Sequence, residues 1–251
     1  MIIDVQKLIL ILVRITSFIL VCPAFSFKGL PNIFKIALSV SISTMVYMVT
    51  PEMEITNELL YFAILAAKEA LFGLAIGYVS KLVFAAIEIA GQLIDFQVGF
   101  SMASVFDPSI GANASNYGRI YYWISICIFF ILDMHHKIIE TLIKSFTYIP
   151  IGEANISGVG IEGVVNLFAI IFELALNLAA PMIIVVLVTD MVLGVISKTV
   201  PQINVLMLGM PLKAMVSFFF TLIMLSWLTS RIGNILETIP GYMEGFMRIF
   251  Q

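Results

Sequence analysis

Charged and amide side chains recur at helical spacing within one long apolar stretch of the sequence. Lys81, Glu88, Gln92 and Asp95 are separated by seven, four and three residues, so a helix would carry them on one face. An ionised carboxylate near the middle of a bilayer costs about 2.5 to 3.5 kcal/mol, whereas one Leu or Ile returns only about 0.5 kcal/mol. We therefore expect this polar stripe to face a partner protein or a water-filled lumen and not lipid.

More polar residues interrupt the apolar sequence of the last third, among them Glu173, Asp190 and Lys213. In a secondary transporter, such residues would form a proton relay or an ion site. In a structural subunit, they would contact partner subunits or line a wet lumen. The second interpretation is favoured because no cluster of acidic residues gathers around one centre.

Motifs that would carry enzymatic chemistry are absent from the sequence. There is no Gly-rich phosphate-binding loop, and the segment 99–103 lacks the second glycine of a nucleophile elbow. His135 and His136 are neighbours, which point about 100° apart on a helix and seldom bind one metal together. Cys22 and Cys127 lie far apart in apolar sequence and are expected to be packing residues. We therefore predict no catalytic, cofactor or metal site.

The composition indicates a membrane protein. Of 251 residues, 61% are hydrophobic and 12% are charged, and the mean hydropathy is +1.09. A soluble domain of this length would need many more charged residues to cover its surface. The net charge of −3 also argues against general nucleic-acid binding, because no basic face is available for phosphates.

Seven apolar runs are long enough, or nearly so, to cross a bilayer as helices, which takes about 20 residues. They are rich in Leu, Ile, Ala and Met and lack the alternation of an outer-membrane barrel, so an all-α fold is predicted. The first run is expected to be a retained helix and not a secretion signal, because Arg14 lies inside it. The runs cover residues 8–25, 33–50, 59–80, 82–105, 120–132, 164–189 and 203–229.

Helix-ending residues separate these runs. Pro and Gly predict turns at 28–31, 50–52, 149–152 and 199–201. The segment 107–118, DPSIGANASNYG, is dense in Pro, Gly, Ser and Asn and is expected to be a loop.

Two stretches of sequence resemble a known family. The first runs from Gly91 to Pro108, GQLIDFQVGFSMASVFDP, and the second from Pro201 to Lys213, PQINVLMLGMPLK. Together with the spacing of the apolar runs over the whole chain, they are similar to the FliR family of flagellar export-gate proteins. The equivalent virulence-secretion family, SctT, is the close alternative, and a secondary transporter is a more distant one.

The resemblance implies a non-enzymatic subunit without cofactors, built as a single domain over residues 1–251. FliR-like proteins assemble with FliP and FliQ into a helical gate of long helices and bent helical hairpins, to which FlhB and FlhA are added. Unfolded flagellar proteins are the cargo, and the location is the inner membrane at the flagellar basal body.

The family pattern also implies a plug in the closed pore. It matches the turn that runs from Phe106, Asp107 and Pro108 through Gly111 to Gly118. Phe100, Met102 and Phe106 are candidates for an apolar constriction, because flexible Met and Phe side chains can seal against ions and deform around a polypeptide. Ordinary packing remains an equal alternative for any one of them.

The second stretch is expected to shape a helix hairpin against neighbouring subunits. Pro201 and Pro211 would bend or end helices there. The family motif comprises Pro201, Gln202, Asn204, Gly209, Pro211 and Lys213.

Overall fold

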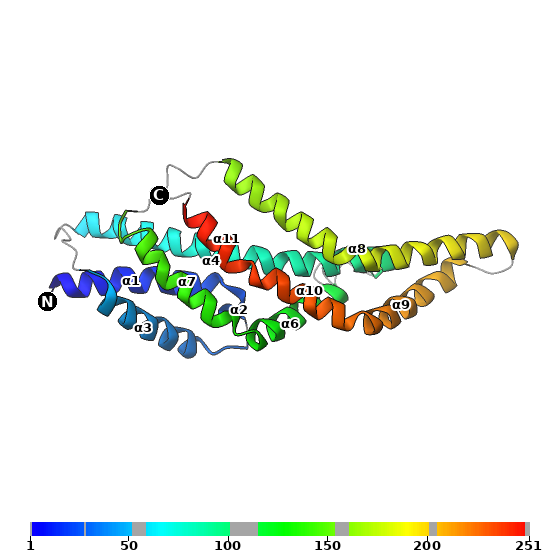
Figure 1. Ribbon diagram of the computed structural model, residues 1–251, viewed down its shortest axis with the longest axis horizontal. Helices are drawn as coiled ribbons and strands as arrows, with labels where there is room; N and C mark the ends of the chain where they lie inside the picture. Colours follow the sequence, from blue (N-terminus) through cyan, green and yellow to red (C-terminus); the bar gives the residue numbers. More distant parts are fainter. Residues whose placement is uncertain are drawn as a thin grey trace. The chain divides into compact units, whose positions relative to one another are not determined.

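Helices make up the fold of the computed structural model (Figure 1). The structure describes residues 2–27, 29–51, 59–100, 115–153, 161–200 and 205–248, and no strand occurs within these ranges. The all-α prediction is therefore confirmed. The helices are α1 (Ile2–Val21), α2 (Pro23–Ser26), α3 (Asn32–Val49), α4 (Leu59–Val98), α6 (Asn116–Ile131), α7 (Met134–Tyr148), α8 (Ile161–Thr199), α9 (Val205–Ile223), α10 (Leu225–Glu237) and α11 (Ile239–Met247).

Several of these helices are long and apolar enough to cross a membrane. Within the described residues, α3, α4 and α8 meet that requirement by length and composition. A fourth span arises if α9 and the following helices to Met247, bent by 71° at a short break, are counted as one. The prediction of a polytopic membrane protein is confirmed.

The runs 59–80 and 82–105 were expected to be two spans, but residues 59–98 form one helix of 40 residues, and residues 101–105 of the second run lie outside the described residues. No Gly or Pro separates them, and the exposed Lys81 at the join does not interrupt the backbone hydrogen bonds. At 1.5 Å per residue α4 is about 60 Å long, roughly twice the thickness of the hydrocarbon core. Part of α4 therefore extends beyond a single perpendicular crossing.

Two of the later helices contain a proline in their interior. α8 continues through Pro181 to Thr199, and α9 continues through Pro211. Each proline removes one backbone hydrogen bond but need not end a helix in a membrane protein. The expected run 203–229 is instead interrupted at Met224, between α9 and α10.

The chain divides into two units that interleave in sequence. The first contains residues 1–83, 129–168 and 237–251, and the second contains residues 84–128 and 169–236. That the whole of 1–251 acts as one domain stays a prediction.

α1 supplies much of the core of the first unit. Leu10, Ile11, Ile15 and Phe18 are completely buried. α4 approaches the backbone of α1 closely through its two glycines: a Cβ atom added at Gly77 would lie 3.0 Å from the carbonyl oxygen of Phe18, and one at Gly73 would overlap that of Arg14. Gly73 and Gly77 form a GxxxG pair, a spacing of small residues that lets two helix backbones approach closely.

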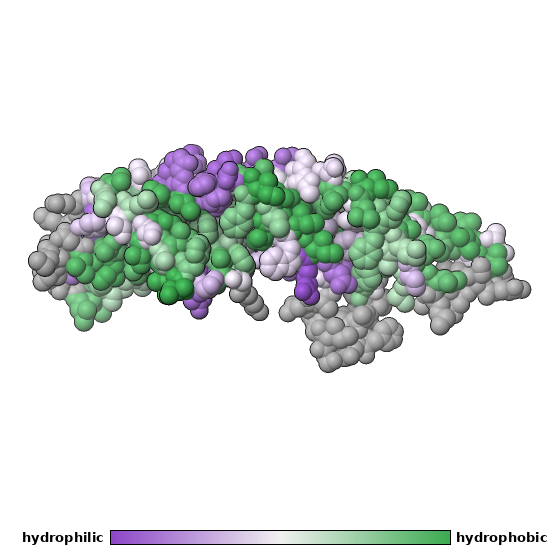
Figure 2. Space-filling model, turned by 90° about the horizontal axis from the view of Figure 1, so that it is seen from below, coloured by the Kyte–Doolittle hydropathy of each residue, from purple (hydrophilic) through white to green (hydrophobic). Residues whose placement is uncertain are grey.

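Large apolar side chains remain exposed in both units. Apolar residues, in green, are widespread on the coloured part of the face in Figure 2. In the first unit Met48 on α3 is 80% exposed, and in the second Met215 on α9 is 74% exposed. Contiguous apolar surface of this kind marks contact with lipid or with other proteins.

Candidate functional site

In the second unit, the carboxylate of Asp95 caps the start of α6. Asp95 lies on α4 and is 2% exposed. Its Oδ2 accepts a hydrogen bond from the backbone N–H of Tyr117 at 3.0 Å, and the hydroxyl of Ser115 donates to the same oxygen. The first N–H groups of a helix have no partner within the helix, and the helix N-terminus attracts negative charge. Asp95 therefore satisfies an otherwise unpaired donor.

Ser115, the residue directly before α6, also caps the start of this helix. Its Oγ accepts a hydrogen bond from the backbone N–H of Gly118 at 2.9 Å, three residues further on. This is the usual geometry of an N-cap serine. We call the contacts of Asp95, Ser115, Tyr117 and Gly118 the α4–α6 junction.

The backbone of Asp95 also binds the chain that leaves α4. Gly99 has a φ of 101° and ends the helix in a left-handed conformation, which glycine adopts without a steric cost. The N–H groups of Gly99 and Phe100 both donate to the carbonyl oxygen of Asp95, at 3.1 and 3.0 Å. The bond from Phe100 is that of a Schellman motif. One residue thus contacts the chain on both sides of the segment 101–114.

Two glycines allow α4 and α6 to touch at the junction. A Cβ atom added at Gly91 would overlap the backbone of Gly118. A Cβ atom at Gly118 would overlap the hydroxyl of Ser115 and lie 3.2 Å from the carbonyl oxygen of Glu88. Any larger residue would have to separate the helices.

An aromatic cluster packs beside the junction. The ring of Tyr117 stacks on Phe218 of α9 at a centroid distance of 5.4 Å, and Phe100 lies 6.4 Å from Tyr117 and 6.1 Å from Phe218. The Tyr117 hydroxyl hydrogen-bonds to Ser217 Oγ at 3.0 Å. α4, α6 and α9 are therefore held together where the segment 101–114 begins and ends.

The residues of the polar stripe have different environments. Lys81 and Gln92 are exposed, Glu88 is half-buried and Asp95 is buried. For Asp95 the structure gives a contact within the chain, at the start of α6. That the stripe meets a partner or a lumen stays a prediction.

Two of the pore and plug candidates lie within the described residues. Phe100 belongs to the aromatic cluster, and Gly118 lies in the first turn of α6 and not in a loop. The remaining candidates lie outside the described residues: Met102, Phe106, Asp107, Pro108 and Gly111.

Lys213, from the second family motif, forms an ion pair with Asp190 of α8. Gln97 of α4 donates a hydrogen bond to Asp190 Oδ2 at 3.4 Å. A Cβ atom at Gly209 would lie 3.5 Å from Leu193 Cδ1, so α9 packs close to α8 here. Pro211 lies inside α9, while Pro201, Gln202 and Asn204 lie outside the described residues.

The sequence interpretation missed a buried ion pair in the first unit. Arg14 of α1 and Glu69 of α4 are both completely buried, and Nε of Arg14 donates to Oε2 of Glu69. Arg14 also donates to the carbonyl oxygen of Ile149 at 3.0 Å, and Glu69 accepts from the N–H of Gly152 at 2.8 Å. The pair therefore links α1, α4 and the turn after α7.

A signal for this pair is present in the sequence. Glu69, Gly73 and Gly77 recur at intervals of four, which places them on one face of a helix. A carboxylate on the face that approaches another helix most closely needs a buried cation as partner. Arg14, alone in its apolar run, is that cation.

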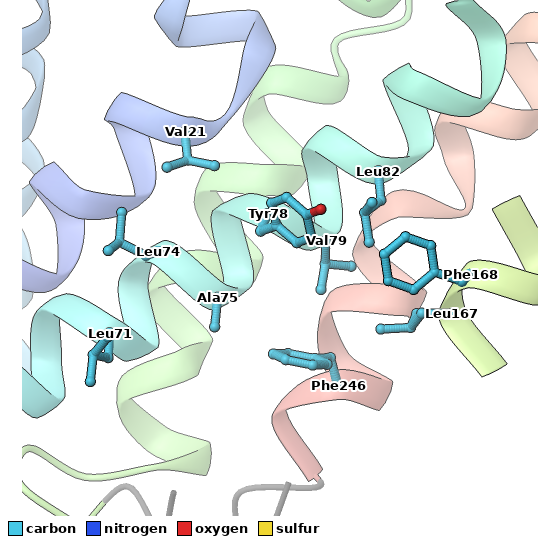
Figure 3. Close-up of a pocket in the computed structure, with 10 residues that line it drawn as sticks. All are labelled: Val21, Leu71, Leu74, Ala75, Tyr78, Val79, Leu82, Leu167, Phe168 and Phe246. Carbon is cyan, nitrogen blue, oxygen red and sulfur yellow. The ribbon is translucent and has the colours of Figure 1, made fainter. Parts of the chain in front are cut away.

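The first unit also contains an apolar cavity of about 400 Å³ (Figure 3). Val21, Tyr78 and Phe246, from three different helices, are among the residues that line it. Among the described residues that line the cavity, none is charged, and the Tyr78 hydroxyl is the one polar side-chain group. The cavity suits a hydrocarbon group and not an ion.

Comparison with known proteins gives a consistent result over almost the whole chain. Residues 5–239 match the family described as bacterial export proteins, family 1. The chain is 31% identical to the flagellar biosynthetic protein FliR of Bacillus subtilis (strain 168), over 96% of this chain and 94% of that protein. It is 30% identical to FliR of Aquifex aeolicus (strain VF5), with coverages of 95% and 92%. The Yop proteins translocation protein T of Yersinia pestis is 31% identical over 61% of this chain and 60% of its own length.

Proposed function

This chain belongs to bacterial export proteins, family 1, and from that membership we propose that it is a non-enzymatic subunit of the flagellar type III export gate. The observation that carries the proposal is its similarity to FliR proteins over more than nine-tenths of both chains. The family match over residues 5–239 includes the residues of the α4–α6 junction.

The exposed apolar surface supports a role as one subunit among several. Met191, Met215 and Phe219 on α8 and α9 are each more than 60% exposed. A membrane helix can place such residues against lipid, but a gate subunit can place them against other subunits. We propose FliP and FliQ as the subunits that cover them, with FlhB and FlhA added to the same complex in the bacterial inner membrane at the flagellar basal body.

The cargo is a chain of unfolded flagellar protein. Its side chains vary, so a gate must seal without a specific binding site. Phe100 and the Met102 and Phe106 of the neighbouring segment would supply deformable apolar groups for the seal. The α4–α6 junction would then fix the chain on both sides of the segment 101–114, where the family pattern implies the plug.

Two other functions remain as alternatives. The similarity to the Yop proteins translocation protein T favours a virulence secretion gate, but it covers less of the chain than the similarity to the FliR proteins. A secondary transporter would need an ion or solute site. Asp190 is paired with Lys213, and Glu173 is exposed, so neither carboxylate is a buried, unpaired group that would hold an ion.

Export of flagellar proteins tests the proposal. We expect deletion of the chain from its bacterium to abolish swimming and secretion of hook and filament proteins, and we expect a plasmid copy to restore both. The purified chain alone in liposomes should conduct neither ions nor small solutes. Normal flagella in the deletion strain, or solute flux by the isolated chain, would refute the proposal.

A further inference from the structure

The turn between α6 and α7 brings three possible metal ligands together in the first unit. Asp133 precedes α7 and has a φ of 53°, a left-handed conformation that Asp adopts more readily than most residues. The chain therefore turns sharply between Ile131 and Met134. As a result, the carboxylate of Asp133 lies beside the first turn of α7.

The ligand atoms of this turn lie close together. One side-chain ligand atom each from Asp133, His135 and His136 can be chosen so that all three lie within 4.8 Å of one another. His136 Nδ1 is 3.8 Å from Asp133 Oδ1, and the two imidazole rings are 4.0 Å apart at an angle of 37°. The side chains of neighbouring residues on a helix were expected to point apart, but the rings of His135 and His136 lie side by side. The turn before α7 adds the carboxylate of Asp133 to them.

Two of these three side chains are open to solvent, and the third has a ring nitrogen without a hydrogen-bond partner among the described residues. The side chains of Asp133 and His136 are 74% and 73% exposed, so an ion can reach them. His135 Nδ1, in contrast, is buried and has no hydrogen-bond partner among the described residues. A buried polar atom without a partner costs free energy that a bound ion can recover.

Nearby charges favour a cation only weakly. Lys137 is adjacent in sequence, but its Nζ lies 3.9 Å from Glu237 Oε1, so that carboxylate offsets its charge. The N-terminus of α7 also repels a cation. The Asp133 carboxylate opposes that repulsion, and without it the two imidazoles would face a positive helix end alone.

We propose that Asp133, His135 and His136 bind one divalent ion of the zinc, nickel and copper class. Two imidazole nitrogens and one carboxylate oxygen form a donor set that these metals prefer, with water in the remaining positions. Among the described residues, these three form the one group of at least three His, Cys, Asp or Glu side chains whose ligand atoms lie this close together. The site is independent of the proposed export function.

Zinc titration of the full chain in detergent tests this site, after a cleavable affinity tag has been removed. The two histidines are the only ones in the chain, so a histidine-specific reagent reports on this site alone. We expect one zinc ion per chain by calorimetry and protection of both histidines from the reagent. His136→Gln and Asp133→Asn should each weaken zinc binding by about tenfold or more.

Glu140→Gln is the matched control, because Glu140 lies on the same helix and pairs with Lys144 instead. It should bind zinc as the unmodified chain does, and all variants should elute from size-exclusion columns alike. The proposal is refuted if the unmodified chain shows no saturable zinc binding. It is equally refuted if binding survives in His136→Gln and disappears in Cys127→Ser.

Discussion

Asp95 interacts with the chain on both sides of the segment 101–114. Its carbonyl oxygen accepts from Gly99 and Phe100, where the chain leaves α4, and its carboxylate accepts from Tyr117, where the chain enters α6. A force that pulls on that segment would therefore act on Asp95 from both of its ends, through the backbone at the end of α4 and through the side chain at the start of α6. This makes Asp95 the side chain whose replacement should most directly alter how the segment is held.

Replacement of Asp95 by leucine should destabilise the chain more than replacement by asparagine. Leucine leaves the buried N–H of Tyr117 unpaired, which costs about 1 to 3 kcal/mol, whereas the asparagine oxygen can still accept that hydrogen bond. We expect a lower melting temperature in detergent and reduced swimming for Asp95→Leu. Gln92→Leu, at an exposed position of the same helix, should have little effect on melting. Equal melting temperatures for the two Asp95 variants would show that the cap does not contribute.

The Arg14–Glu69 pair gives a second prediction at this scale. Removing one partner leaves a buried charge alone and should cost about 3 to 5 kcal/mol, while replacing both by apolar residues can be close to neutral. Arg14→Leu and Glu69→Leu should therefore each lower the melting temperature more than the double variant does. If the double variant melts at the temperature that the sum of the single effects predicts, the two side chains are not coupled.

The helices themselves could largely be predicted from sequence. Long runs of Leu, Ile and Ala favour helices, and within the described residues the chain turns at 29–31 and 149–152, where Gly and Pro predict it. The joined α4 could not be predicted from hydropathy, because a charge such as Lys81 breaks an apolar run without breaking a helix. Pro211 was expected to bend or end a helix, and it lies inside α9, because proline disturbs a helix without necessarily ending it.

Side-chain partners were harder to predict than the helices. Asp95 was recognised as a residue that could not face lipid, but its partners lie 20 and 22 residues further along the chain. Arg14 and Glu69 are 55 residues apart. Spacing along one helix shows which residues share a face, and it does not show which other helix that face meets.

Close packing of α4 on α6 gives a prediction at the scale of elements. Gly91→Ala would place a methyl group on the backbone of Gly118 and force the helices apart. Gly194→Ala is the matched control, because nothing lies within 4 Å of the added atom there. Since Ala favours a helix over Gly by about 1 kcal/mol, the control should melt at an equal or higher temperature.

The Gly91→Ala variant should melt lower and should secrete less flagellar protein. If it matches Gly194→Ala in both measurements, the close contact of α4 and α6 is not needed for stability or export.

At the scale of the whole molecule, the central feature is apolar surface that the chain does not cover itself. α3, α8 and α9 expose large apolar side chains, and α4 is longer than one perpendicular bilayer crossing requires. Lipid can cover part of such a surface. Partner helices can cover all of it, including any part that lies outside the bilayer.

Native mass spectrometry of the complex extracted in mild detergent tests this account most directly. We expect the chain to leave the membrane bound to several copies of other helical membrane proteins, with FliP and FliQ among them. Removal of these partners should expose apolar surface of the chain and cause it to aggregate. A stable, fully bilayer-embedded monomer, recovered without companions from cells that export flagellar proteins, would contradict the account.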